Sequence, residues 1–307
     1  MAATRTFIVT GGNTGLGFHC AAFLSLDRES LVVVACRDPR SGEEAARKLR
    51  RNGARIEVLP LDLADQASVR AFVEAFHKLA SPPLAGLVCN AGLQNIGAPG
   101  RTAEGYETTF AVNHLGHYLL ARLLLSAMAA DARIVFVSSG AHDPAQKSGL
   151  PDPRYESADA VAHDFEAGAD AGRRRYATSK LCNVLCTYEF TRRLAAAPDP
   201  RRQSIRVNAF DPGLMPGTGL ARTYPAILRF AWNYVLPAAT LFMRNVNRPA
   251  KSGQRLALLA NGPQGVVTGK YFSEGRESRS SDLSYDRAKA LDLWDASARM
   301  TGLPVEL

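Results

Sequence analysis

The 307-residue sequence predicts an α/β fold built on a doubly wound parallel sheet with helices on both faces. Short apolar runs rich in β-branched residues alternate with helix-like segments through the first two-thirds of the chain. The runs LVVVA and RIVFVSS are almost continuously apolar, which is typical of strands covered on both faces. Strands and helices in alternation imply right-handed crossovers between neighbouring parallel strands.

The predicted strands follow these apolar runs in chain order, at residues 6–10, 31–35, 55–60, 86–90, 134–138 and 205–209. The helix-like segments repeat apolar residues on one face, at residues 18–26, 42–52, 67–79, 104–129 and 177–195. This is a Rossmann-type arrangement, and such sheets bind ligands outside the carboxyl ends of their strands, where the strand order reverses. We therefore expect the functional residues directly after the strands.

No linker rich in Pro, Gly or Ser divides the sequence, so residues 1–307 are expected to form a single domain. Residues 140–175 are polar and longer than an ordinary connection, which indicates an inserted functional loop or flap. Residues 214–250 mix apolar helix faces with aromatic residues and prolines, and we interpret them as a small helical substrate lid. An apolar wall suits a hydrophobic small-molecule substrate, although an oligomer interface or ordinary core gives the same pattern.

The charge and hydropathy patterns exclude several kinds of partner. The net charge is +8, but basic residues are interspersed with acidic ones and form no nucleic-acid-binding signature, so no nucleic acid is expected. A strand that begins at residue 6 leaves no room for a secretory signal, which favours a cytoplasmic location. The longest apolar stretch, residues 226–243, is interrupted by Arg229, Asn233 and Pro237. No transmembrane segment is therefore expected, while peripheral contact with a membrane stays open.

The five cysteines mostly lie inside apolar runs, where reduced thiols pack as small hydrophobic groups. Cys182 and Cys186 share a helical face, but no His, Asp or further Cys lies near them in sequence. The sequence therefore predicts no metal site. It leaves both a monomer and a homo-oligomer open.

A glycine-rich turn follows the first predicted strand and precedes a helix-like pattern. Glycine lets the backbone turn sharply and approach a pyrophosphate, while the start of a helix offers free N–H groups. This strand–turn–helix context favours a dinucleotide-binding turn over a plain glycine-rich one. The residues expected to contact the cofactor here are Gly11, Asn13, Thr14, Gly15, Leu16 and Gly17.

The end of the second strand is where dinucleotide-binding folds discriminate the adenosine ribose. A carboxylate there pairs with a free 2′-hydroxyl, whereas a guanidinium favours a 2′-phosphate. Arg37 occupies the strand-end position, which predicts NADP(H) as the cofactor. The alternative, in which Arg37 is merely exposed and Asp38 contacts the ribose, stays open at this point.

Two further strand ends carry small or polar residues. Asp62 and Leu63 follow the third strand, where a carboxylate can lie near the adenine amino group. Asn90, Ala91 and Gly92 follow the fourth, where small residues let a cofactor pass close to the backbone. Either group alone is an ordinary turn, but both recur at the same edge of the sheet, so we expect them to line the cofactor site.

The catalytic candidates lie after the fifth strand and on a later helix. Tyr176 and Lys180 are four residues apart and therefore share one helical face. A neighbouring ammonium lowers the pKa of a phenol, which is about 10 for free tyrosine, and so suits the phenol to proton transfer. Ser139 can donate a hydrogen bond to the same reacting oxygen. Asn113, inside the segment 104–129, can hold a water molecule that links Lys180 to solvent.

Together these motifs resemble the short-chain dehydrogenase/reductase family in identity and order. The matching residues are Thr10, Gly11, Gly15, Gly17, Asp62, Asn90, Ala91, Gly92, Asn113, Ser139, Tyr176, Lys180, Pro212 and Gly213. The resemblance implies an enzyme in which Asn113, Ser139, Tyr176 and Lys180 are catalytic, and it selects Ser139 over Ser138. It also implies that Pro212, Gly213 and Thr218 contact the cofactor, as Tyr176 and Lys180 do.

Within this family the sequence is similar to retinol dehydrogenase-like enzymes and to light-dependent protochlorophyllide reductases. The supporting segments are residues 35–38, 88–92, 179–183, 218–220, 268–272 and 293–294. The expected function is NADP(H)-dependent hydride transfer to or from a hydrophobic carbonyl or alcohol, such as a retinoid, steroid or other lipophilic ketone or aldehyde. Two alternatives stay open: reduction of a carbon–carbon double bond, as in protochlorophyllide reductase, and a non-catalytic NADP(H)-binding sensor.

Overall fold

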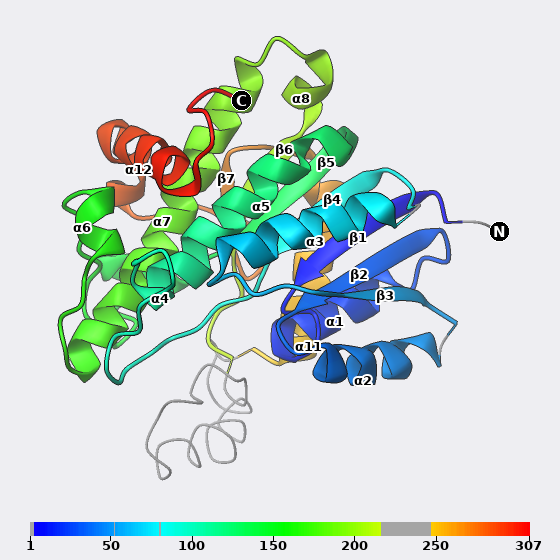
Figure 1. Cartoon of the computed structure of the whole chain (residues 1–307), viewed down its shortest axis with the longest axis horizontal. Helices are drawn as coiled ribbons and strands as arrows, with labels where there is room; N and C mark the ends of the chain where they lie inside the picture. Colours follow the sequence, from blue (N-terminus) through cyan, green and yellow to red (C-terminus); the bar gives the residue numbers. More distant parts are fainter. Residues whose placement is uncertain (1–2, 52, 80, 216–246) are drawn as a thin grey trace.

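A computed structural model describes residues 3–51, 53–79, 81–215 and 247–307, and in these residues one sheet lies between two layers of helices (Figure 1). The strand order is β3-β2-β1-β4-β5-β6-β7-β8, and β8 alone runs antiparallel to its neighbour. The order reverses between β1 and β4, so the predicted doubly wound, Rossmann-type sheet is confirmed. The strands are β1 (Arg5–Thr10), β2 (Ser30–Cys36), β3 (Arg55–Pro60), β4 (Leu84–Cys89), β5 (Met128–Val137), β6 (Arg206–Asp211), β7 (Lys270–Ser273) and β8 (Arg276–Ser278).

Helices cover both faces of the sheet. The α-helices in the described residues are α1 (Gly15–Leu24), α2 (Pro39–Arg50), α3 (Gln66–Lys78), α4 (Thr108–Phe110), α5 (Gly116–Leu124), α6 (Ala158–Ala162), α7 (Ala169–Ala195), α8 (Pro200–Ser204), α11 (Pro249–Asn261) and α12 (Arg287–Thr301). A π-helical turn, η1 (Ala111–Leu115), joins α4 to α5. Short 3-10 turns are η2 (Leu125–Ala127), η3 (Gly140–His142), η4 (Pro144–Gln146), η7 (Pro263–Val266) and η8 (Asp282–Tyr285).

The side chains of the apolar strands pack in two cores, one on each face of the sheet, because successive side chains of a strand point to opposite faces. Phe7 and Val9 of β1 are buried in the core beneath α1, α2 and α11, whereas Ile8 is buried in the core beneath α3, α5 and α7. Figure 1 shows these two helical layers on opposite sides of the strands. The double coverage explains why the strands are almost continuously apolar.

The predicted helix over residues 104–129 is wrong in its continuity and at both ends. The α-helical part begins at Thr108 after Glu107, whose carboxylate accepts a hydrogen bond from Phe110 N–H. The segment then passes through the π-helical turn, and β5 begins at Met128. Both α5 and β5 are buried, so apolar residues continue from one into the other. The apolar pattern therefore does not show where the helix ends and the strand begins.

The segment 140–175 forms more regular structure than the predicted loop or flap. It contains η3, η4 and α6, and α7 begins at Ala169, before the predicted start at residue 177. Tyr155, Ala158 and Val161 of this segment are buried in the core beneath α7. The sequence reasoning also left out the terminal strands β7 and β8 and the helices α8, α11 and α12.

Most of the predicted lid lies outside the described residues, as does the apolar stretch 226–243. The described ends of this segment meet, because Asn247 N–H donates a hydrogen bond to Leu214 C=O at 2.9 Å. In the parts of the chain that the structure describes, no helix combines the length and apolar character needed to cross a bilayer.

Candidate functional site

The glycine-rich turn between β1 and α1 is compact because two glycines allow the backbone to fold against itself. Gly11 has a φ of +63°, and a Cβ on Gly17 would lie 2.4 Å from Gly11 O and 2.5 Å from the Asn90 side chain. A larger residue at position 17 would push the turn away from the end of β4. Gly15 also has a positive φ and begins α1, whose N-terminus has no side-chain cap at Thr14. The first N–H groups of α1 therefore face the turn without a side-chain acceptor.

Two charged residues, Arg37 and Asp38, follow β2 and have different contacts. Asp38 caps α2, because its carboxylate accepts a hydrogen bond from Arg40 N–H at 3.0 Å. Arg37 is exposed beside it. Asn13 of the glycine turn donates a hydrogen bond to Ser41 Oγ at 2.9 Å and so ties the turn to α2. The carboxylate at this strand end is thus engaged by the backbone, which favours the guanidinium as the group that meets a ligand.

The ends of β1 and β4 are held together across the switch point. Thr10 Oγ1 accepts hydrogen bonds from Asn90 N–H and Ala91 N–H, both at 2.9 Å, and Asn90 Nδ2 donates to Thr10 O. At the end of β3, Asp62 Oδ1 accepts from Ala64 N–H, and Leu63 is buried. The predicted cofactor residues after β1, β3 and β4 therefore lie along one edge of the sheet.

Tyr176 and Lys180 lie on one face of α7, as their spacing predicts. Lys180 Nζ is 5.5 Å from the centre of the Tyr176 ring, and both side chains are buried. The ammonium also donates a hydrogen bond to Val137 O, at the end of β5, over 3.1 Å. Burial lowers the pKa of Lys180 to about 8, while the charge of Asp211 acts in the opposite direction. A cation this close to a phenol favours the phenolate.

Two adjacent serines follow β5 and differ in what their hydroxyls contact. Ser138 Oγ donates a buried hydrogen bond to Lys180 O at 2.8 Å, and so fastens α7 to the strand end. Ser139 Oγ accepts a weaker hydrogen bond of 3.3 Å from Ala141 N–H at the start of η3. Ala141 also packs in one apolar cluster with Tyr176. The side chain of Ser138 therefore holds α7 in place, whereas Ser139 leads into the turn η3, whose Ala141 packs against Tyr176.

Asn113 clamps three parts of the site together. Its side-chain oxygen accepts a hydrogen bond from Leu93 N–H at 2.8 Å, and its Nδ2 donates to Leu93 O and to Ser179 Oγ, each at 2.9 Å. Ser179 precedes Lys180 on α7. The amide thus joins the loop after β4 to α7, and the sequence analysis did not identify Ser179 as its partner.

His117 is a further residue of the site, and the sequence analysis did not identify it. Its Nδ1 lies 3.2 Å from Asn113 O and its Nε2 lies 2.9 Å from Thr10 Oγ1. A carbonyl oxygen only accepts, so Nδ1 carries the hydrogen and Nε2 accepts from the Thr10 hydroxyl. Burial lowers the pKa of His117 to about 3, which keeps the ring neutral. The four-residue spacing of Asn113 and His117 was the one local signal of this contact.

Pro212 and Gly213 follow β6 at the same edge of the sheet. Pro212 O accepts a hydrogen bond from Ser252 Oγ at 3.0 Å, and Gly213 adopts a φ of +75°. The turn is therefore fixed against α11. Thr218, the remaining predicted cofactor residue, lies outside the described residues.

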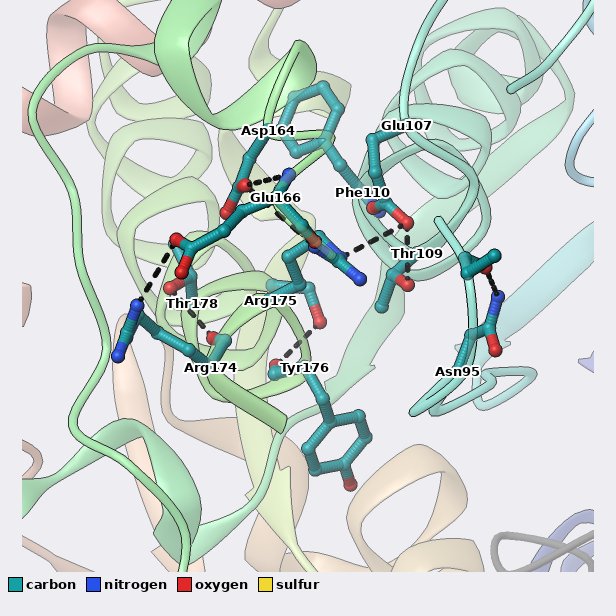
Figure 2. A network of polar contacts seen from close by, with 12 residues as sticks. Asn95, Glu107, Thr109, Phe110, Asp164, Glu166, Arg174, Arg175, Tyr176 and Thr178 are labelled. Atoms are coloured by element: carbon teal, nitrogen blue, oxygen red, sulfur yellow. Dashed lines mark hydrogen bonds and ion pairs between the residues drawn. The ribbon is translucent and has the colours of Figure 1, made fainter. Parts of the chain in front are cut away.

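A buried charge network adjoins Tyr176 on the other side of α7. Arg175 Nε lies 3.6 Å from Glu107 Oε1, and Arg175 Nη1 lies 3.7 Å from Asp164 Oδ1 and donates a hydrogen bond to Glu166 O. Burial raises the pKa of Glu107, against the opposing effect of Arg175. Figure 2 shows the Tyr176 ring pointing away from the Arg175 guanidinium. The network therefore fixes Arg175, the residue that precedes Tyr176 on α7.

Within the described residues, no group of three or more His, Cys, Asp or Glu side chains is arranged to hold a metal ion. All five cysteines are free and buried. Burial raises the pKa of Cys182 and Cys186 far above its ordinary value, as expected for thiols packed in a core.

The chain is similar in sequence to known oxidoreductases along nearly its whole length. The family model described as short chain dehydrogenase matches residues 5–155. The chain is 33% identical to protochlorophyllide reductase A of Oryza sativa subsp. japonica, over 96% of its own length and 80% of that protein. It is also 33% identical to retinol dehydrogenase 12 of Homo sapiens, over 97% of its own length and 87% of that protein.

Solved structures share the fold. A protein of unknown function from Mycobacterium paratuberculosis has a TM-score of 0.73 and 29% identity, with coverage of 99% of this chain and 96% of that one. An angucycline C-6 ketoreductase with bound NADP has a TM-score of 0.64 and 23% identity, with coverage of 90% and 97%.

Proposed function

The chain belongs to the short-chain dehydrogenase/reductase family, and on this premise we propose that it transfers hydride between NADP(H) and a hydrophobic carbonyl or alcohol. The observation that carries the proposal is the Tyr176 phenol with the Lys180 ammonium 5.5 Å from its ring, at the sheet edge that also bears the glycine turn. Two buried titratable groups in this arrangement, beside a dinucleotide-type turn, are typical of proton transfer coupled to hydride transfer.

The cofactor is proposed to lie across the switch point between β1 and β4. Its pyrophosphate would meet the uncapped N-terminus of α1, which the glycine turn leaves open. Its 2′-phosphate would meet Arg37, since Asp38 is engaged as the cap of α2. The remaining contacts are assigned to Gly11, Asn13, Thr14, Gly15, Leu16, Gly17, Asp62, Leu63, Asn90, Ala91, Gly92, Tyr176, Lys180, Pro212, Gly213 and Thr218.

The bound nicotinamide supplies or accepts the hydride. In reduction, Tyr176 gives a proton to the substrate oxygen as negative charge develops there. Ser139 donates a hydrogen bond to the same oxygen, and the positive charge of Lys180 stabilises the phenolate that Tyr176 becomes. Asn113 keeps the loop after β4 and α7 in register, so that these groups converge.

A second candidate function is reduction of a carbon–carbon double bond. The chain is as similar to protochlorophyllide reductase A as it is to retinol dehydrogenase 12, at 33% identity to each. The pair Tyr176 and Lys180 serves either reaction, because both need a proton donor beside the hydride. Assays with both substrate classes separate the two candidates.

The proposal is tested by following NADPH absorbance while the protein is offered retinal, steroid ketones, and aliphatic and aromatic aldehydes. Protochlorophyllide is assayed in parallel, in darkness and under illumination. Turnover of a carbonyl supports the first candidate, and light-dependent turnover of the tetrapyrrole supports the second. Binding of NADPH without turnover of any of these compounds would contradict both and support a non-catalytic sensor.

Replacing Arg37 by Asp should reverse the cofactor preference. The new carboxylate repels a 2′-phosphate and can accept a hydrogen bond from a free 2′-hydroxyl, so we expect the NADPH affinity to fall about tenfold or more relative to NADH. The measurement is the dissociation constant of each cofactor by nucleotide fluorescence. Arg51→Asp, at the far end of α2, makes the same charge change on an exposed residue and serves as the control. An equal effect of both substitutions would exclude Arg37 as the phosphate contact.

A further inference from the structure

Asp211 is a buried carboxylate at the end of β6 that no sequence motif identified. Its side chain is held by neutral donors: Gly213 N–H binds Oδ1 at 2.9 Å, while the hydroxyls of Tyr271 and Ser273 lie 3.2 and 3.3 Å from Oδ2. Only 6% of the residue is exposed. In the described parts of the chain, no Lys, Arg or His nitrogen lies within 4.0 Å of this carboxylate. Its negative charge is therefore fixed in place without a direct ion pair.

The groups that fix Asp211 also reach the active-site serine. The Tyr271 ring packs against the His142 ring, with 4.9 Å between their centres. His142 Nδ1 donates a hydrogen bond to Ser139 O at 2.7 Å, and its Nε2 accepts from Ser281 N–H at 3.1 Å. Burial lowers the pKa of His142, so the ring stays neutral in this tautomer at neutral pH. Asp211 is thus one end of a rigid cluster beneath Ser139.

The sheet register places this carboxylate at the same strand ends that hold Lys180. Lys180 Nζ is bound to Val137 O, and Val137 pairs with Phe210, the residue that precedes Asp211. A Cβ on Gly140, directly after Ser139, would lie 3.4 Å from Asp211 Oδ2. The carboxylate therefore lies at the strand ends where the ammonium and the serine meet.

The charges around Lys180 explain why the position of Asp211 matters. Burial alone lowers the pKa of Lys180, and the charge of Asp211 opposes that effect. Among the residues that the structure describes, Tyr176 on the same helix and the neutral His117 are the other titratable groups that interact with the ammonium. A buried ammonium with no nearby negative charge tends to lose its proton near neutral pH.

We propose that Asp211 is a positioning residue for the reaction, whose fixed negative charge keeps Lys180 in the ammonium form beside Tyr176. The inference rests on the proposed function, because Lys180 matters to turnover only if Tyr176 transfers the proton. The carboxylate itself touches neither substrate nor cofactor in this role. It acts through the charge of Lys180.

The test is the substitution Asp211→Asn, which keeps the shape of the side chain and removes its charge. The Nζ resonance of Lys180 is titrated by NMR in ¹⁵N-lysine-labelled protein without cofactor, and is assigned with Lys180→Arg. We expect the midpoint to fall by about 0.5 pH unit or more, because removal of a nearby negative charge favours loss of a proton. The alkaline limb of the pH profile for the reduction should move in the same direction.

Asp211→Ser is a second neutral variant, measured in the same way in case the first does not fold. Ser273→Ala is the matched control, because it removes one hydrogen bond to Asp211 and leaves the charge in place, so its midpoint should stay near that of the wild type. An unchanged Lys180 midpoint in a folded neutral variant would overturn the proposal. Because the NMR titration needs no turnover, this outcome is distinct from a failure of the wild-type protein to reduce any substrate.

Discussion

Replacing Tyr176 by Phe is expected to lower the rate of NADPH-dependent reduction by about a thousandfold, with the affinity for NADPH changed by less than about twofold. The substitution removes only the phenolic oxygen. The ring keeps its place in the cluster with Ala141 and Ala177, so α7 should remain packed against η3. Without the proton donor, the negative charge that develops on the substrate oxygen is met by Ser139 alone. The measurement is kcat and KM by NADPH absorbance, with binding measured separately by fluorescence.

Tyr188→Phe is the matched control for this substitution. Tyr188 lies three turns further along α7 than Tyr176, and its hydroxyl shares a buried hydrogen bond with Ser280, which follows β8. We expect this variant to lose some stability and to keep its kcat. Turnover by the Tyr176 variant at the wild-type rate would remove the phenol from the mechanism, and with it the role assigned to Lys180.

The parts of the fold and the site that depend on neighbours in sequence could be predicted from the sequence. The strands were predicted because doubly covered strands are almost continuously apolar, and the glycine turn because Gly11 and Gly17 permit a fold that other residues obstruct. The spacing of Tyr176 and Lys180 fixes their common helical face without knowledge of the rest of the chain. Their role in the reaction stays a prediction until it is assayed.

The features that escaped prediction depend on partners far away in the chain. The contact between Asp211 and Tyr271 joins residues 60 positions apart, and that between Thr10 and His117 joins residues 107 apart. No local pattern marks such pairs, because each partner alone resembles an ordinary core or surface residue. The break at the π-helical turn before α5 was missed for a related reason, since it changes the hydrogen bonding of the backbone and not the apolar pattern.

Arg175→Met is expected to cost about 3 to 5 kcal/mol of unfolding free energy, although Met fills a similar volume. The Arg175 side chain is 3% exposed and the Glu107 side chain is wholly buried, so removal of the guanidinium leaves a buried carboxylate without its cation. Glu107 cannot move to water easily, because it accepts hydrogen bonds from Thr109 Oγ1 and Phe110 N–H at the start of the helix that carries Asn113. Urea unfolding followed by circular dichroism measures the loss.

The double variant Glu107→Gln, Arg175→Met separates the cost of an unpaired charge from the cost of lost packing. Gln keeps an acceptor for Phe110 N–H and carries no charge, so the double variant should be more stable than Arg175→Met alone. Arg174→Met is the control on the adjacent residue, where a partly exposed ion pair of 3.4 Å with Glu166 should contribute less than about 1 kcal/mol. Equal losses from Arg174→Met and Arg175→Met would show that burial of the pair is unimportant. A selective loss at Arg175 would instead show that the buried ion pair with Glu107 stabilises the segment that leads into Tyr176. Because Glu107 caps the helix that leads to Asn113, this pair would link Tyr176 to that helix.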